Sequence, residues 1–532
     1  MKIGDKKMKI LLSNGSIVLP DKIFRGELLI EDSKIGYLGQ KIEENTIFEN
    51  LDAEIDCESK YIFPGIIDPH VHLRDMKQKY KETVETGTKA AINNGVTSVF
   101  TMSNTVPRLS TPEFIRNYQK KIEKNIYCNV GIYGNISTGF NFNLMQDLKQ
   151  LGIYGIKIYP GDTSSLFLLD WSPMLDIYRI LKGNFPDNNV DPKLVKIQFD
   201  EYFSVMINKK NFEEKTSNWR KLFKRAAELN IPILLHTDVP ILKIDREKEF
   251  NERVECGENL LNAHSQIYSK YQELVHILFT FEILKNIKNE NVAESNKEKE
   301  LNVIPSMRFC HVSCPESVEL IKLLSNELNN QEFEIEVSPH HLFLNYSDVN
   351  PEKKTHAKVL PPLRSREDMM HIQKLFLSGA FSFIGTDHAP HTTAEKNDTF
   401  FAAPAGFPSL DIYVPFFLTK IIDGFSSFQD FVKYASLYPA KHLKMKRKGI
   451  LEENYDADLF VLKEVPPYQI EPKSFYSKSK LSPYNLDNIK VVVEQVFLDG
   501  KLVVTKDKKI LKANKILKKY LDKPIGKLFL PT

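Results

Sequence analysis

Residues 63–74 read Phe63-Pro64-Gly65-Ile66-Ile67-Asp68-Pro69-His70-Val71-His72-Leu73-Arg74, an apolar run that leads directly into two histidines one residue apart. Side chains of a β-strand alternate between its two faces, so His70 and His72 project from the same face if this segment is extended. Two imidazoles on one face can bind one metal ion. The pair could equally be two histidines that only line a strand, and the rest of the chain decides between these interpretations.

The composition is that of an ordinary large globular protein. Of the 532 residues, 42% are hydrophobic and 27% are charged, with a formal net charge of +3. This balance predicts a small-molecule ligand rather than binding to nucleic acid or to a membrane. The five cysteines are too sparse for a disulfide-rich scaffold and fit a reducing compartment. Because the polar, lysine-rich N-terminus has no signal-like apolar core, we expect a cytoplasmic protein.

The middle of the chain, from residue 64 to 442, alternates apolar strand-like runs with helix-like stretches, as parallel β/α units do. Eight such strands predict an α/β fold that closes into a (β/α)8 TIM barrel, in which catalytic groups lie at the carboxyl ends of the strands. The expected strands are residues 66–72, 97–103, 126–132, 154–159, 232–237, 307–312, 333–338 and 382–387.

Both chain ends have a different sequence pattern from the middle. Residues 1–63 alternate short apolar runs with turn signals such as Asn14-Gly15, and residues 443–532 contain similar runs at 457–462 and 491–504. We interpret these runs as short antiparallel strands. Because neither end supplies enough strands to bury a sheet face alone, we expect both ends to combine into one small composite β-sandwich domain beside the barrel.

Two stretches do not fit the β/α alternation, residues 186–217 and residues 285–302, and we interpret both as low-complexity insertions. The second consists almost entirely of charged and amide side chains. Such a segment buries too little apolar surface to offset the entropy lost on ordering it. We therefore expect it to be exposed and mobile, with its charges simply solvated.

Polar residues fall at the carboxyl ends of five of the predicted strands. Four imidazoles and a carboxylate that converge on one barrel mouth are ligands of the kind that zinc takes. Any one of these histidines alone would more often be a hydrogen-bonded structural residue, whereas the whole set predicts a metal centre. In chain order the candidate residues are His70, His72, Lys157, His236, His311 and Asp387.

Lys157 is the unusual member of this set, because an ammonium has no lone pair and would repel a cation. If its amine reacts with carbon dioxide, the resulting carbamate is an anion with two oxygens that can bridge two metal ions. Two ions held in this way can share an activated water as the nucleophile. The sequence alone equally allows Lys157 to be an ordinary salt-bridge partner.

Together these stretches resemble a known family. The chain is similar to the dihydroorotases of the amidohydrolase superfamily, in the branch that keeps a bridging lysine and includes the dihydroorotase domain of the animal pyrimidine multienzyme. The terminal strands also match the split β-domain of that family. The stretches that carry the resemblance, in order along the barrel, are Pro64–Asp75, Gly155–Tyr159, Cys310–Val312, Ser338–Leu344 and Gly385–Thr392.

The resemblance implies an activity and its cofactors. The reaction would be the reversible closure of N-carbamoyl-L-aspartate to L-dihydroorotate in pyrimidine synthesis, with two zinc ions bridged by carboxylated Lys157. Asp387 would pass a proton from the attacking water to the leaving ring nitrogen, although it could instead be a ligand only. The implied ligands are His70, His72, Lys157 and Asp387 for one ion, and Lys157, His236 and His311 for the other.

Substrate choice would rest chiefly on Arg74, whose guanidinium matches a carboxylate bidentately. By resemblance, Asn104 and His391 complete the carboxylate pocket, and the backbone around Pro404 and Gly406 meets the ring amide. The plainer alternatives are a surface ion pair for the arginine, a helix cap for the asparagine and a loop histidine.

Thr163 lies where the family carries a threonine on a mobile active-site loop. The next residue, Ser164, departs from the animal pattern, which has an aromatic residue there. A plain solvent loop is therefore an equal alternative to a loop that closes over the substrate.

Two other functions remain open at this stage. One is a different cyclic amide hydrolase, such as a dihydropyrimidinase, hydantoinase or allantoinase, and the other is a non-catalytic scaffold on the same fold. We expect a homodimer, and contact with other pyrimidine-pathway enzymes is left open.

Overall fold

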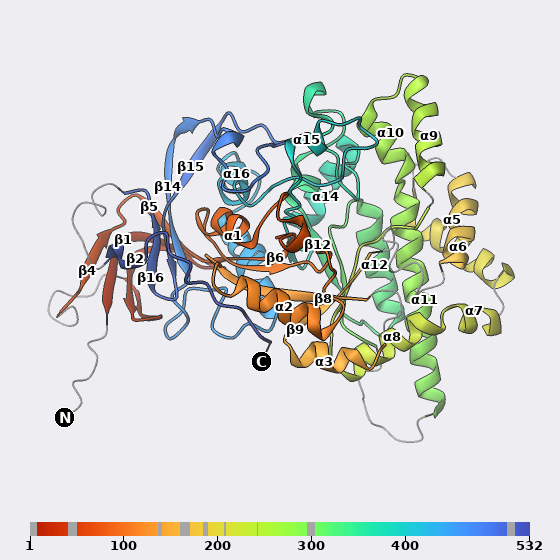
Figure 1. The fold of residues 1–532 in the computed structure, drawn as a ribbon, viewed down its shortest axis with the longest axis horizontal. Coiled ribbons are helices and arrows are strands. Elements are labelled where there is room, and N and C mark those ends of the chain that lie inside the picture. Colours follow the sequence, from red (N-terminus) through yellow and green to blue (C-terminus); the bar gives the residue numbers. More distant parts are fainter. Residues whose placement is uncertain are drawn as a thin grey trace.

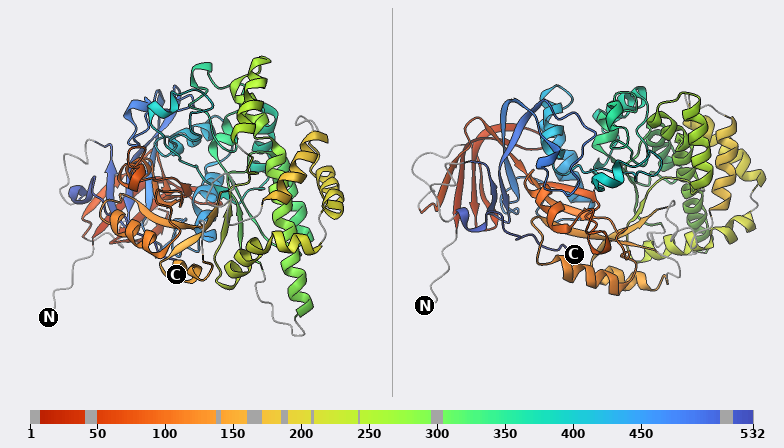
Figure 2. Two further views of the ribbon diagram at one scale, coloured as in Figure 1. Left: turned by 45° about the vertical axis from the view of Figure 1, so that its right-hand side comes forward. Right: turned by 45° about the horizontal axis from the view of Figure 1, so that its top comes forward.

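A computed structural model describes residues 8–40, 50–136, 141–159, 171–184, 190–206, 209–241, 243–294, 304–507 and 517–531. Within these residues the chain forms two eight-stranded β-sheets, and helices surround one of them (Figure 1). The sheet built from the chain ends lies at one side of the molecule, and the helix-covered barrel occupies the other (Figure 2). No helix in the described ranges combines the length and apolar character needed to cross a bilayer.

The barrel sheet is parallel throughout, in the order β13-β12-β11-β10-β9-β8-β7-β6. Its first and last strands meet at a seam, where Val71 and His388 form a parallel bridge. The near-closed eight-stranded barrel predicted from the sequence is therefore confirmed. Its strands are β6 (Ile66–Val71), β7 (Val96–Thr101), β8 (Asn129–Asn135), β9 (Ile153–Ile158), β10 (Ile233–Leu235), β11 (Met307–Phe309), β12 (Glu334–Val337) and β13 (Phe383–Ile384).

The buried carboxylate of Asp68 fastens this seam. Its Oδ1 accepts the backbone N–H of His70 and that of Thr386, each at 3.1 Å, and its Oδ2 accepts the Thr386 hydroxyl at 2.6 Å. The carboxylate therefore joins the first strand to the segment after the last strand. The backbone N–H of His72 adds a bond to the carbonyl of His388 at 2.7 Å.

The observed strands agree with the expected ones to within a few residues. The clearest difference is β8, which begins at Asn129 rather than at residue 126. Residues 126 and 127 bond outside the sheet, because the carbonyl of Ile126 accepts the N–H of Gly526 and the N–H of Tyr127 donates to the Thr88 hydroxyl.

The second sheet combines both chain ends, as expected, in the order β16-β15-β14-β5-β1-β2-β3, with β4 paired to β1. The expectation of purely antiparallel strands is wrong at β1, which pairs in parallel with β4 and β5 because the chain crosses over between them. The strands are β1 (Lys9–Val18), β2 (Ile23–Glu31), β3 (Lys34–Gly39), β4 (Ala53–Asp56), β5 (Lys60–Pro64), β14 (Leu459–Tyr468), β15 (Ile489–Leu498) and β16 (Lys501–Thr505).

Strand β14 shows how this sheet joins the barrel. Leu459 and Val461 pack into the sheet's own apolar core, whereas Phe460 and Leu462 pack into the core of the barrel. The alternation follows from the two-residue period of a strand. The sheet therefore stands on the same continuous core as the barrel strands that carry the site.

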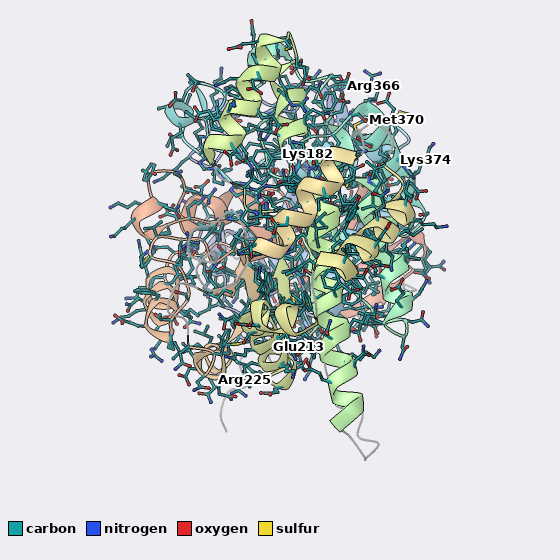
Figure 3. The ribbon with its side chains drawn as sticks, turned by 90° about the vertical axis from the view of Figure 1, so that its right-hand side faces the viewer. Lys182, Glu213, Arg225, Arg366, Met370 and Lys374 are labelled. Carbon is teal, nitrogen blue, oxygen red and sulfur yellow. The ribbon has the colours of Figure 1, made fainter. Side chains whose placement is uncertain are left out.

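Between β9 and β11 the barrel carries additional helices, which Figure 3 views face-on. They are α5 (Ser172–Asn184), α6 (Pro192–Met206), α7 (Lys209–Lys215), α8 (Ser217–Glu228), α9 (Lys243–Glu255), α10 (Leu260–Ile267) and α11 (Lys270–Glu294). The remaining helices are α1 (Val84–Ile92), α2 (Pro112–Ile122), α3 (Leu144–Gln150), α12 (Pro315–Glu327), α13 (Pro339–Phe343), α14 (Arg366–Leu377), α15 (Thr393–Lys396), α16 (Tyr413–Ile422), α17 (Phe428–Val432) and α18 (Tyr438–His442), with a π-helical turn at Lys433–Leu437.

The two predicted insertions need correction. Residues 192–206 form α6 and residues 209–215 form α7, and Val195 and Phe199 of α6, four residues apart, are buried in the barrel core. Residues 285–294 form the last turns of α11, where Ile287 is fully buried, so this part of the second stretch is not wholly exposed. Composition alone hid these apolar positions, because α6 interleaves them with charged and amide residues and Ile287 stands among polar ones. Residues 295–302 lie outside the described ranges.

We predict that Asp68→Ala lowers the free energy of unfolding by about 2–4 kcal/mol, because it leaves buried donors at the seam without an acceptor. Urea denaturation measures this change. Asp21→Ala, at an exposed position, is the matched control and should change stability by less than about 0.5 kcal/mol. Equal, small effects of the two substitutions would show that Asp68 does not hold the seam.

Candidate metal centre

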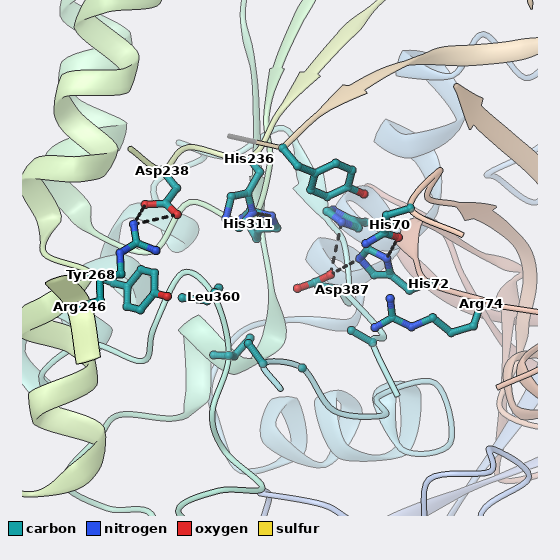
Figure 4. Close-up of a pocket in the computed structure, with 16 residues that line it drawn as sticks. His70, His72, Arg74, His236, Asp238, Arg246, Tyr268, His311, Leu360 and Asp387 are labelled. Carbon is teal, nitrogen blue, oxygen red and sulfur yellow. Dashed lines mark hydrogen bonds and ion pairs between the residues drawn. The ribbon is translucent and has the colours of Figure 1, made fainter. Parts of the chain in front are cut away.

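The polar residues singled out in the sequence lie together at the carboxyl ends of the barrel strands (Figure 4). His70 and Lys157 lie near the ends of β6 and β9, whereas His236, His311 and Asp387 follow β10, β11 and β13 by one to three residues. All of them except Lys157 border a cavity of about 470 Å³. The cavity is lined by His70, His72, Arg74, Asn104, Tyr159, His236, Asp238, Arg246, Tyr268, His311, Val359, Leu360, Asp387, Ala389, Ala405 and Gly406.

One group of possible ligands consists of His70, His72 and Asp387. The carboxylate Oδ1 of Asp387 lies 3.0 Å from His72 Nε2 and 3.4 Å from His70 Nε2. One ligand atom of each residue lies within 4.8 Å of the others, and all three residues are buried. Asp387 holds this position with a positive φ of 48°, which is uncommon for a residue with a side chain. The turn after β13 is therefore specialised for aiming this carboxylate.

The outer nitrogens of both imidazoles are already engaged. His70 Nδ1 lies 2.6 Å from Glu336 Oε1, and His72 Nδ1 lies 2.7 Å from Asn104 Oδ1. Carboxylate and amide oxygens only accept hydrogen bonds, so each Nδ1 carries the proton. Each Nε2 lone pair is then directed towards Asp387 Oδ1. Three electron-rich atoms that face one another in this way require either an extra proton or a cation between them.

The electrostatics of this group favour a positive charge. Burial alone would lower the pKa of His70, but Glu336 and Asp387 raise it to about 10. Burial would raise the pKa of Asp387, yet His70 and His72 hold it well below its usual range. For His72 the largest effect is burial, which lowers its pKa to about 4. The negative charges that raise the pKa of His70 would stabilise a bound metal cation in the same way.

His236 and His311 form the second group. Their rings meet edge to face with centroids 4.7 Å apart, and His236 Nδ1 lies 3.0 Å from His311 Nε2. The His311 ring is also 5.2 Å from that of His70, so the two groups adjoin. Burial, followed by the charge of Lys157, lowers the pKa of both histidines well below the usual value.

Lys157 lies beneath these imidazoles and is completely buried. Its Nζ has no hydrogen-bond partner and, among the described residues, no carboxylate within ion-pair distance. The ordinary salt bridge that the sequence left open is therefore not present in this part of the chain. The ring of Tyr159 lies near it, with the ring centroid 5.3 Å from Nζ. An ammonium buried without a hydrogen-bond acceptor or a carboxylate is costly.

Arg74 lines the cavity with the histidines, and His391 lies behind it, next to Arg74 but not among the lining residues. Arg74 is 7% exposed, and its Nη2 lies 3.2 Å from His391 Nε2. His391 Nδ1 in turn lies 3.1 Å from Lys81 Nζ, and Lys81 pairs with Glu395. Burial and then the charge of Arg74 lower the pKa of His391, so this imidazole stays neutral.

Of the other residues predicted to contact the substrate, some line the cavity and one does not. Asn104 and Gly406 line the cavity, whereas Pro404 does not, and its carbonyl accepts a hydrogen bond from Lys396. Ala405 lines the cavity in its place. Thr163 lies outside the described residues.

Sequence reasoning missed several groups at this site. Glu336 was not counted among the site residues, although a glutamate between the apolar residues Ile335 and Val337 of a strand was a usable signal. The ligand atoms of Glu336, Cys310 and His70 also lie within 4.8 Å of one another. Asp238 and Arg246 pair at 3.2 Å on the far wall, where the Tyr268 ring stacks against the guanidinium (Figure 4). Only the folded chain brings these last residues to the cavity.

Comparisons with known proteins agree with this geometry. The model of the amidohydrolase family matches residues 61–503. A dihydroorotase of Ligilactobacillus salivarius is 27% identical over 94% of this chain and 100% of its own length, and one of Pyrococcus horikoshii is 28% identical over 93% and 91%. An L-hydantoinase (dihydropyrimidinase) from Arthrobacter aurescens has a similar structure, with a TM-score of 0.75, 20% identity and coverage of 98% and 99% of the two chains.

We predict that Glu336→Gln weakens metal binding by about 10–100-fold, because the amide cannot hold the His70 Nδ1 proton as strongly as the carboxylate does. Competition with a chelator, followed by metal analysis, measures the affinity. Glu332→Gln, an exposed glutamate four residues earlier, should leave it unchanged. Wild-type affinity in both variants would mean that Glu336 does not orient a ligand.

Proposed function

Because the chain belongs to the amidohydrolase family, we propose that it is a dihydroorotase, which interconverts N-carbamoyl-L-aspartate and L-dihydroorotate. The matches place it among the cyclic amidohydrolases of the dihydroorotase and hydantoinase group. Those enzymes share the fold, so the choice of substrate has to come from the cavity itself.

The guanidinium of Arg74 is the feature of the cavity that favours dihydroorotate over an uncharged ring. It lines the cavity beside the histidines, and its Nη2 lies 3.2 Å from Nε2 of the neutral His391 ring. Among the described residues, no carboxylate lies within ion-pair distance of it. A buried, unpaired guanidinium favours an anionic ligand, and a carboxylate matches its geometry. Dihydroorotate carries a carboxylate, whereas the ring of dihydrouracil has no charge.

The donor set also fits a pair of divalent ions. His70, His72 and Asp387 would hold one ion, and His236 and His311 the other, with Lys157 between the two groups. In its ammonium form Lys157 would repel a cation, and as a carbamate it would become an anionic ligand instead. Zinc suits these nitrogen and oxygen donors, and a pair of such ions would polarise the amide carbonyl and lower the pKa of water.

In this proposal, three side chains at the cavity have separate roles in binding the substrate, moving a proton and orienting a ligand. Arg74 binds the carboxylate of the substrate and thereby fixes where the ring lies. The carboxylate of Asp387, at the cavity surface, accepts a proton from the attacking water and delivers it to the ring nitrogen as the amide bond breaks. Asn104 fixes the orientation of His72 by accepting its Nδ1 proton. The barrel holds all three at strand ends, so their spacing is set before the substrate arrives.

The proposal predicts that the zinc-loaded protein hydrolyses dihydroorotate far better than dihydrouracil or allantoin. Arg74→Met should raise KM for dihydroorotate by about 100-fold, because a bidentate charged contact of about 2–3 kcal/mol is lost. Initial rates over a range of substrate concentrations measure this. Lys77→Met, at a nearby lysine outside the cavity, is the control. Preference for an uncharged ring, or unchanged kinetics in the arginine variant, would refute the assignment.

A second prediction concerns Lys157. Lys157→Ala should lose bound metal and activity together, and small carboxylic acids such as acetate should restore part of both by replacing the missing anion. Metal analysis and turnover, each with and without the acid, provide the measurement. Full activity in the variant without any added acid would remove the carbamate from the mechanism.

A further inference from the structure

Two lysines lie buried behind the cavity wall, and their ammonium groups contact backbone carbonyls. Lys396, at the end of α15, is 1% exposed and donates to the carbonyls of Pro404 at 2.9 Å, Gly406 at 3.0 Å and Lys358 at 3.2 Å. Lys358 is 8% exposed and donates to those of Phe400 and Phe401 at 2.9 Å and Ala403 at 2.7 Å. No carboxylate in the described ranges pairs with Lys396.

These bonds immobilise residues 400–406 by their backbone. His391 Nε2 adds a contact to the Ala405 carbonyl at 3.0 Å. Six of the seven carbonyls in this segment therefore lie within hydrogen-bond distance of a side-chain nitrogen of Lys358, Lys396 or His391. The backbone N–H of Gly406 also donates to the Lys358 carbonyl at 2.9 Å. A loop held at so many points has little freedom to adjust its position.

The held segment forms part of the cavity. Ala405 and Gly406 line it directly. Gly406 has a φ of +113°, and a Cβ placed there would come within 2.7 Å of both Cβ and O of Ala389. Ala389 follows Asp387 by two residues, and its N–H donates to the Phe407 carbonyl at 3.0 Å. The backbone wall is thus packed tightly against the turn that carries the proposed proton carrier.

Apolar residues could fill the same space without burying two charges, which costs several kcal/mol even in a relaxed protein. The cost is visible at Lys396, where burial and the nearby Lys358 lower the pKa to about 7. The charge of Lys396 also acts with those of Arg74 and Lys81 to lower the pKa of His391, which contacts Arg74.

We infer that Lys396 and Lys358 are positioning residues that fix the 400–406 backbone as the substrate-contacting wall. The identity of the substrate that meets this wall, dihydroorotate, rests on the proposed function. The fixing of the wall does not depend on it, because it follows from contacts in the protein alone.

The test compares Lys396→Met, which keeps the length of the side chain but removes the charge and the donors, with Lys374→Met on the exposed surface of α14 (Figure 3). Hydrogen–deuterium exchange of the substrate-free protein reports on the wall. We expect exchange in peptides covering 400–407 to become about tenfold faster or more in the first variant only. We also expect KM for dihydroorotate to rise about tenfold while kcat stays within about threefold and the metal content is unchanged.

Lys358→Met should give the same pattern, and it serves if the first variant does not fold. In the wild-type protein, which needs no substitution, the amide of Gly406 should exchange as slowly as those of the barrel strands. Unchanged exchange and KM in the lysine variants, fast wild-type exchange at Gly406, or a loss of protection spread over the whole barrel would each overturn the inference. If dihydroorotate is not a substrate but the local loosening occurs, the proposed function fails and the positioning role stands.

Discussion

The contact of one carboxylate oxygen of Asp387 with two imidazoles, those of His70 and His72, depends on the seam of the barrel. The histidines belong to the first strand and the carboxylate follows the last, so they meet only because the sheet curls until its edges touch. Asp68 joins those edges through its hydrogen bonds with Thr386. The same closure brings His311 against His70. The geometry of the centre is therefore a property of the whole barrel rather than of any loop.

The distribution of charge around this centre is uneven. Glu336 and Asp387 attract a cation to the first pair of histidines, whereas the ammonium of Lys157 repels one from the second. Carboxylation of Lys157 would remove that conflict. Around Arg74 the local charge is positive instead, because Arg74, Lys81 and Lys396 act on a neutral His391, and this region attracts an anion. A floor that would hold cations and a wall that attracts anions suit the proposed substrate, which carries both a reactive amide and a carboxylate.

Much of this arrangement could be predicted from local patterns. The order of the apolar runs was sufficient for the barrel and for the sheet made of both chain ends. The sequence also picked out the polar residues that the fold brings together, although their roles remain predictions. Features that depend on distant partners were not predictable: the parallel pairing of β1 with β5, the buried apolar positions of α6, the pairing of Glu336 with His70, and the lysines behind Gly406. In each case a residue with ordinary local context acquires its role from a neighbour far away in the chain.

The most direct test of the account is an anomalous-scattering map from crystals of the zinc-loaded protein, recorded at the zinc edge. The account predicts two peaks about 3.5–4 Å apart, one among His70, His72 and Asp387 and one beside His236 and His311, with added density on Lys157 between them. A single peak elsewhere in the protein, or no peak among these residues at full zinc loading, would contradict it.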